Sequence, residues 1–198
     1  EDLQTNGYKG IFGLDFVVND SEADVYVIES NPRLIASIPI FTDLQLLGEE
    51  TPLLFWHLSS LGWQNLLDQY SSNHNYRFDQ KGFLKSKEQL GRIRHGSQVI
   101  LHNTQPYSQI IDCKLDAGIY TLEADKLQFI RSSLHFSDIL NSREFLLLPT
   151  GQNRIIHPGI EYARVQFKRS VLEQNNVLRG SDRNLIKSIQ ESFGLRRP

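Results

Sequence analysis

The sequence contains no methionine and a single cysteine among its 198 residues. Because one thiol cannot form an internal disulfide, we expect Cys113 to be reduced and the compartment to be the cytoplasm. No apolar run approaches the roughly 18 residues of a membrane-spanning helix, so no membrane partner is expected. The chain opens on Glu1 without a charged-then-apolar leader, so nothing predicts secretion, and we expect it to be a segment of a longer protein.

Basic residues are scarce in the first third of the chain. Residues 1–70 carry eleven acids against Lys9 and Arg33, a balance of −9, whereas residues 71–198 carry twelve acids against nineteen bases, a balance of +7. This asymmetry predicts two units with different partners. An acidic segment with two cations suits a divalent metal better than a nucleic acid. The expected division is a first unit over 1–70, a linker over 71–95, a β-rich domain over 96–170 and a helical segment over 171–198.

The first unit is predicted to begin with a β-hairpin over residues 7–31. Phe12, Leu14, Phe16 and Val18 recur at every second position, the pattern of a strand with one buried face. A polar turn over 19–24 separates it from a second strand over 25–29. Helical stretches are expected over 42–47, from Pro52 to Leu61, and over 64–70.

The remaining residues predict a sheet of short strands. The expected strands lie at 97–102, 118–122, 127–131, 144–148 and 160–168. Short strands at this spacing are typical of a small antiparallel barrel or sandwich. Ser181 is predicted to cap a terminal helix whose apolar side is formed by Leu185, Ile186, Ile189 and Phe193. The fold class is therefore expected to be α+β.

Two carboxylates are predicted to face each other on the hairpin. With Asn19 opposite Val25 and Phe16 opposite Ile28, Asp15 lies opposite Glu29. Opposed residues lie about 4.5–5.5 Å apart at Cβ, where like charges destabilise the pair, so a cation is expected between them. Asn31 lies on the same face two residues beyond Glu29 and offers a neutral oxygen. Oxygen ligands of this kind suit Mg²⁺.

Arg33 follows Pro32 at the edge of this predicted metal site. A guanidinium there can hold a phosphate or carboxylate oxygen through two parallel hydrogen bonds. Metal, phosphate and arginine together indicate phosphoryl-transfer chemistry. The alternative is a solvated hairpin whose acids are surface residues and whose residues 30–33 form a turn; spacing alone weighs the two interpretations about equally.

Residues 7–16, GYKGIFGLDF, and residues 26–33, YVIESNPR, resemble the C-terminal half of an ATP-grasp domain, over about residues 5–65. The resemblance implies an antiparallel hairpin packed with helices, in which Asp15, Glu29 and Asn31 hold Mg²⁺ or Mn²⁺ on the phosphates of ATP. It implies that Glu29 and Asn31 thereby bind the nucleotide, and that Arg33 is a catalytic residue that steadies an acyl phosphate.

The implied reaction is the ATP-dependent activation of a small-molecule carboxylate for attack by an amine. Asp15 in the first position resembles amide-forming ligases, whereas Asn31-Pro32-Arg33 resembles the carbamoyl phosphate synthetase branch, so a carboxylase-like enzyme stays an alternative. A non-catalytic nucleotide- or partner-binding module is the alternative from another class. The family's lysines, adenine pocket and lid belong to an earlier half, so we expect this segment alone not to turn over.

Other polar residues are interpreted as structural. The six histidines form no zinc-binding pattern, and His57 on the apolar side of its helix favours a structural role. Cys113 is expected to be inert, and Ser37 to cap a helix rather than to line a substrate site. The cations of residues 81–94 favour a solvated face or an anion-attracting rim over nucleic acid, and Arg164, Lys168 and Arg169 share that ambiguity. Association with further copies of the chain is left open.

Overall fold

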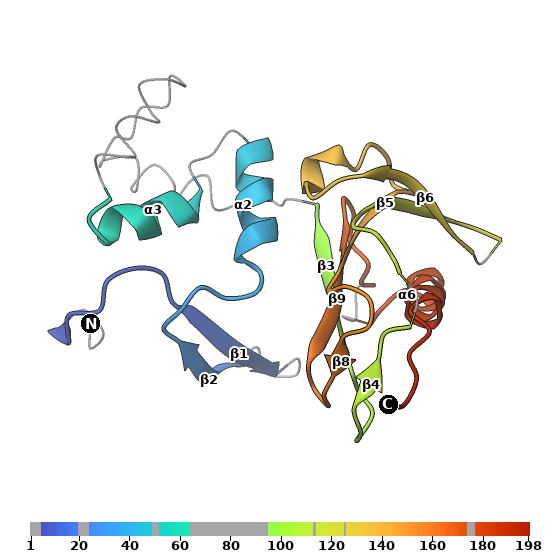
Figure 1. The fold of residues 1–198 in the computed structure, drawn as a ribbon. Coiled ribbons are helices and arrows are strands. Elements are labelled where there is room, and N and C mark those ends of the chain that lie inside the picture. Colours follow the sequence, from blue (N-terminus) through green and yellow to red (C-terminus); the bar gives the residue numbers. More distant parts are fainter. Residues whose placement is uncertain are drawn as a thin grey trace. The chain divides into compact units, whose positions relative to one another are not determined.

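The computed structural model describes residues 5–19, 24–48, 52–63, 95–112, 114–124, 126–173 and 177–198 (Figure 1). The chain divides into two compact units, Glu1–Ile93 and Arg94–Pro198. The predicted helix over 64–70, nearly all of the predicted linker and Cys113 lie outside the described residues. The finer domain limits therefore stay predictions.

The first unit contains a two-stranded antiparallel sheet, β1 (Gly13–Asn19) with β2 (Asp24–Asn31). Asp15 pairs with Glu29, as predicted. Beyond this pair the predicted register is wrong, because Phe16 pairs with Val27 rather than with Ile28. A β-bulge inserts Ile28 as an extra residue of β2, and every pair toward the turn shifts by one position.

The predicted buried face of the hairpin is also wrong. Among the hairpin residues whose burial is described, Gly13 and Asn31 are buried, and large apolar side chains are exposed along both strands. These side chains are Leu14, Phe16, Val17, Val25, Tyr26, Val27 and Ile28. The physical reason is that the sheet has only two strands, so no second layer of described strands covers either face.

Two helices follow the hairpin, α2 (Ile38–Leu47) and α3 (Leu53–Ser60). Helix α2 begins four residues before the predicted Thr42, because Pro39 is accommodated in the first turn, and it ends at Gly48 as expected. Ser37 occupies the N-cap position without a side-chain capping bond; its carbonyl accepts the Phe41 N–H at 3.0 Å. Helix α3 is confirmed within one residue at each end of the predicted stretch from Pro52 to Leu61, with Pro52 as its N-cap rather than its first residue.

The second unit is built on a five-stranded antiparallel sheet with the order β3-β9-β7-β5-β6. Its strands are β3 (Ser97–His102), β5 (Gly118–Glu123), β6 (Lys126–Ser132), β7 (Phe145–Pro149) and β9 (Glu161–Phe167). A small sheet pairs β4 (Gln109–Ile110) with β8 (Ile155–Ile156), and a 3-10 helix η1 spans Phe136–Asp138. All five predicted strands are therefore confirmed within about a residue at each end.

The predicted barrel or sandwich is wrong, since the sheet stays open with β3 and β6 as its edges. Its core side packs instead against α6 (Gly180–Ser192). The apolar side of α6 is buried as predicted, through Leu185, Ile186, Ile189 and Phe193. Ser181 does not cap the helix, because the N-cap is Arg179. The fold class is mixed α+β, as expected.

Among the helices of the described residues, none has both the length and the apolar character needed to cross a membrane.

Candidate functional site

The opposed carboxylates lie at the open end of the β1–β2 hairpin. Asp15 and Glu29 are directly paired, and both are exposed. Two pairs further along, Gly13 pairs with Asn31, so the amide lies on the same face as the acids. The bulge begins immediately beyond the Asp15–Glu29 pair, a position where bulges often re-aim side chains at functional sites.

Asn31 connects the two strands through its side chain. Its Nδ2 donates to Asp15 Oδ2 at 3.2 Å, and the residue is 9% exposed. With the nitrogen directed at Asp15, the carbonyl oxygen Oδ1 accepts no hydrogen bond within the described ranges. The predicted donors therefore come together as two carboxylates and one amide oxygen.

The acid pair has no cationic partner among the described residues. None of the ion pairs between described residues involves Asp15 or Glu29. Like charges on opposed strand positions repel, so this end of the hairpin favours a bound cation.

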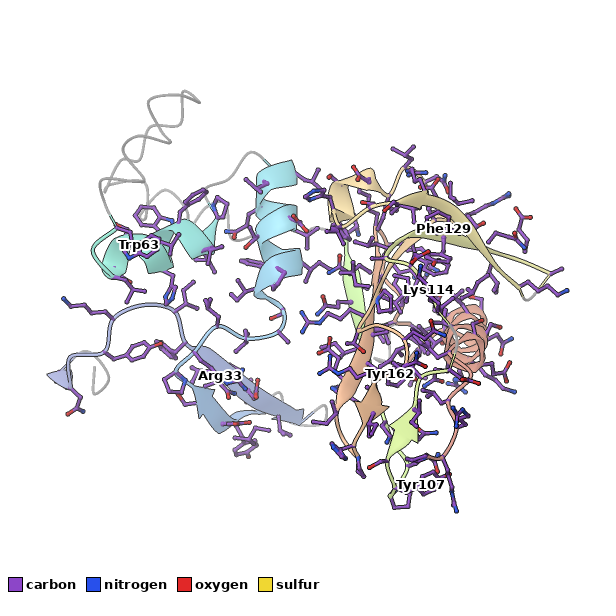
Figure 2. The ribbon with its side chains drawn as sticks, in the orientation of Figure 1. Arg33, Trp63, Tyr107, Lys114, Phe129 and Tyr162 are labelled. Carbon is purple, nitrogen blue, oxygen red and sulfur yellow. The ribbon has the colours of Figure 1, made fainter. Side chains whose placement is uncertain are left out.

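Arg33 lies two residues beyond Asn31 and is exposed (Figure 2). Its N–H donates to the Asn31 carbonyl at 2.8 Å, which closes a tight turn centred on Pro32. Its guanidinium contacts the Leu34 carbonyl at 3.4 Å, a weak interaction at the limit of hydrogen-bond distance. The backbone of Arg33 is thus fixed next to Asn31, whereas its charged end remains accessible to an anion.

The donor set fits a hard divalent cation. The described residues hold no group of three or more His, Cys, Asp or Glu side chains placed to bind a metal. The hairpin instead offers two acids with an amide, and Mg²⁺ commonly binds one or two carboxylates while retaining waters and phosphate oxygens. The chemistry of the three oxygen donors therefore matches the metal that the sequence predicts.

Sequence reasoning missed a cluster that holds the segment before β1. His57 of α3 accepts the Ile11 N–H at Nδ1, 3.1 Å away, and the Tyr8 hydroxyl donates to the Ile11 carbonyl at 2.5 Å. The structural interpretation of His57 is consistent with this bond. The contact joins residues 46 positions apart, so no local pattern in the sequence could indicate it.

The cations of β9 and the turn after it are used in structural contacts. Arg164 pairs with Glu161 at 2.5 Å, and Lys168 donates to the Ser137 carbonyl at 2.8 Å. Arg169 forms two contacts with Asp182, which is 1% exposed, and so ties the end of β9 to the first turn of α6. These contacts favour the structural interpretation of the three cations over nucleic-acid binding.

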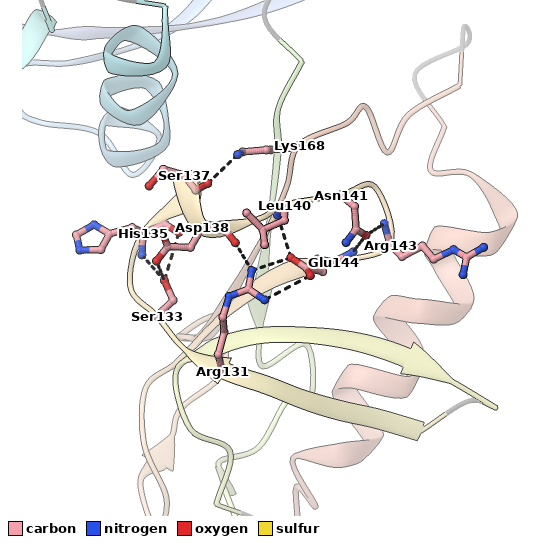
Figure 3. A network of polar contacts seen from close by, with 10 residues as sticks. All are labelled: Arg131, Ser133, His135, Ser137, Asp138, Leu140, Asn141, Arg143, Glu144 and Lys168. Carbon is pink, nitrogen blue, oxygen red and sulfur yellow. Dashed lines mark hydrogen bonds and ion pairs between the residues drawn. The ribbon is translucent and has the colours of Figure 1, made fainter.

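A polar network holds the connection between β6 and β7 (Figure 3). Arg131 donates to Glu144 at 2.9 Å and also contacts the Asp138 carbonyl. Ser133 donates to Asp138 Oδ2 at 2.7 Å, and the backbone N–H of His135 donates to the Ser133 hydroxyl at 3.0 Å. Because nearly every group here is bonded to another group of the same connection, we interpret the network as structural.

A shallow depression of about 650 Å³ lies over residues 102–106 and 158–159. Its buried polar residue is Asn103, whose amide donates to the carbonyls of Tyr107 and Ile156 and accepts the Gln105 N–H. Asn103 is therefore saturated by the protein itself. The nearby Ser108 hydroxyl and His157 Nδ1 are 2.9 Å apart, but this pair is hydrogen-bonded to no carboxylate of the described residues.

Comparison with known proteins identifies no relative. No family model, no curated protein and no solved structure matches the chain.

Proposed function

We propose that the chain supplies the metal-binding side of the nucleotide site in an ATP- and Mg²⁺-dependent ligase of the ATP-grasp type, which joins a carboxylate to an amine. The observation that carries the proposal is the pairing of Asp15 with Glu29 beside Asn31, with no cation of the described residues to neutralise them. The sequence resemblance over about residues 5–65 supplies the reaction class.

Each residue has a distinct role in this proposal. Asp15, Glu29 and Asn31 hold the Mg²⁺ ion, which when bound neutralises phosphate charge. The hydrogen bond from Asn31 to Asp15 fixes the acid and leaves the amide oxygen as the third donor. Arg33 presents an accessible guanidinium two residues beyond Asn31 and binds the transferred phosphate as charge develops on it.

Metal binding by the chain tests the proposal directly. Mn²⁺ in place of Mg²⁺ should broaden the amide NMR signals of Asp15, Glu29 and Asn31 before those of other residues. Glu29→Gln and Asp15→Asn should each weaken Mn²⁺ binding by roughly tenfold or more, because each removes one of two charged donors. Arg33→Ala should preserve Mn²⁺ affinity but weaken the binding of the Mn²⁺ complex of ATP.

Asp116→Asn is the matched control, because Asp116 is an exposed acid of the second unit that pairs with Lys114 at 3.4 Å. It should leave the Mn²⁺ affinity unchanged. Equal affinity in the Glu29→Gln variant and the unsubstituted chain would exclude the metal site. When the chain is joined to an ATP-grasp N-terminal half, release of ADP that is indifferent to both Glu29→Ala and Arg33→Ala would exclude the enzymatic assignment. Nucleotide binding that survives chelation of the metal would favour the non-catalytic module instead.

A further inference from the structure

We infer that His57 is a positioning residue for the acid pair: it fixes the segment that enters β1 and thereby the placement of Asp15 opposite Glu29. The inference concerns the geometry of the hairpin, and its importance for metal binding rests on the proposed function. It adds a residue of α3, 28 positions beyond Glu29, to a site otherwise formed by the hairpin and the turn after it.

Side-chain hydrogen bonds to Ile11 hold the segment that leads into β1. The Ile11 N–H donates to His57 Nδ1 at 3.1 Å, and its carbonyl accepts from the Tyr8 hydroxyl at 2.5 Å. The N–H and the carbonyl of Ile11 are therefore both hydrogen-bonded to side chains, and neither is bonded to the backbone of a neighbouring strand among the described residues. Ile11 is two residues before Gly13, the first residue of β1, so the direction in which β1 begins is set by these two bonds.

Two glycines of this segment are closely packed against side chains. Gly10 has φ +113°, and a Cβ there would lie within 2.7 Å of His57 Cε1 and nearer still to Nδ1. A Cβ on Gly13 would lie 2.7 Å from Ile35 Cγ2. The imidazole thus packs directly on the backbone of Gly10, and the chain is held at two points three residues apart.

These contacts lie only a few residues from the acid pair. Gly13 pairs with Asn31, and Asp15 is two residues along the same strand, about 6.6 Å from Gly13. A two-stranded sheet whose apolar faces are exposed has few other contacts to fix its entry. Loss of the His57 bond should therefore displace Asp15 relative to Glu29 and Asn31.

The identity of the acceptor atom permits a sharp experiment. Nδ1 can accept the Ile11 N–H only when it carries no proton, so the bond requires the neutral ring with its proton on Nε2. Asparagine places its Oδ1 near the position of Nδ1 and preserves an acceptor, whereas leucine fills similar space without one. His57→Asn and His57→Leu therefore separate the hydrogen bond from simple packing.

The test uses NMR of the whole 198-residue chain. In the unsubstituted protein, a through-bond ¹⁵N–¹⁵N coupling should connect the Ile11 amide to His57 Nδ1. His57→Leu should shift the amide signals of Asp15 and Glu29 and weaken the contacts between them, and His57→Asn should restore both. Mn²⁺ affinity should fall about two- to tenfold in His57→Leu, the effect of one hydrogen bond, and recover in His57→Asn.

Three controls keep the outcome specific. His102→Leu changes an exposed histidine of the second unit and should leave the hairpin signals unchanged. Gly10→Ala should reproduce the effect of His57→Leu, whereas Gly7→Ala should have a smaller effect, because Gly7 has φ +78° but no atom within 4 Å of its Cβ position. Retained amide signals of α2 (Ile38–Leu47) show that the first unit of a variant remains folded.

The two proposals fail differently. If Asp15 and Glu29 keep their signals and mutual contacts in His57→Leu, or if His57→Asn fails to restore them, the positioning role is wrong. If the hairpin responds as expected but the unsubstituted chain binds no Mn²⁺, the positioning role stands and the proposed function is wrong.

Discussion

Glu144 illustrates how the surroundings of a single carboxylate determine its charge. The residue is 8% exposed, accepts from Arg131 at 2.9 Å and accepts the Leu140 N–H at 2.9 Å. The hydrogen bond from the Arg131 guanidinium is the main reason why the pKa of Glu144 lies below its ordinary value, and the Leu140 bond adds to the effect. Burial opposes this shift, but the bonds to the charged form outweigh it.

The lowered pKa of Glu144 makes the stability of the second unit depend on pH. Because the folded state favours the charged carboxylate, the stabilisation is complete above the unfolded-state pKa and is lost as the pH falls through the folded-state pKa. Arg131→Gln should raise the pKa of Glu144, destabilise the unit at neutral pH and flatten the acid limb of its stability curve. Urea unfolding between about pH 3 and 7, with the Glu144 carboxyl followed by ¹³C NMR, measures both effects.

Arg143→Gln provides the matched control for Arg131→Gln. Arg143 is exposed, and it joins the same network through its backbone N–H, which donates to Asn141 Oδ1 at 3.0 Å. Its guanidinium forms no hydrogen bond or ion pair with the other residues shown in Figure 3. The control should leave the Glu144 titration unchanged; an equal effect of both substitutions would show that overall charge, not the specific bond, lowers the pKa.

At the scale of elements, the start of α3 depends on a side chain from α2. Pro52 offers no capping side chain, and the Leu53 N–H instead donates to Gln45 Oε1 at 2.9 Å. Gln45 is 5% exposed, so water does not readily replace it. The bond satisfies one of the amide groups that the first turn of every helix leaves without an intrahelical partner.

Gln45→Leu should destabilise the first unit by about 1–3 kcal/mol, because it leaves a polar group without its hydrogen bond. The measurement is the free energy of unfolding followed by amide signals of residues 53–60. Leu47→Ala is the control, since Leu47 lies on the same helix but is 50% exposed. A similar loss in both variants would show that α2 contributes packing alone and not a cap.

The elements that the sequence predicts well are those with a local pattern. Ser97–His102 matches its predicted strand at both ends because apolar residues and flanking turn residues define it. The two-residue strands β4 and β8 depend on partners distant in sequence. The bulge at Ile28 and the cap from Gln45 involve nearby residues, but no repeating pattern of apolar residues marks them. The same distinction holds for the candidate site, where the opposition of Asp15 and Glu29 follows from strand pairing but the contribution of His57 does not.

At the scale of the whole molecule, the division into two units predicts separable stability. The second unit has its own core between its sheet and α6, in which Phe193 is 1% exposed and packs edge-to-face on Tyr162, with ring centroids 5.1 Å apart. Because no described residue of the first unit belongs to this core cluster, damage to the cluster should remain confined to the second unit.

Phe193→Ala should destabilise the second unit by about 3–5 kcal/mol, the usual effect of removing a buried aromatic ring. The amide signals of Asp15 and Glu29 should remain unchanged under conditions in which the second unit is partly unfolded. Leu134→Ala, at a 68% exposed position, should cost far less. Simultaneous unfolding of both units in Phe193→Ala would show that they fold as one cooperative body.

The bulge in β2 separates two properties that a strand normally couples, its pairing and its curvature. If Ile28 is excised, Glu29 still faces Asp15 and Val27 still faces Phe16, because the extra residue takes part in neither pair. The ladder then becomes continuous, and what disappears is the added bend and twist that a bulge gives to its strand. Ile28 therefore does not change which residues of β1 and β2 are paired. It sets the angle between the end of the hairpin that carries Asp15 and Glu29 and the end near the turn.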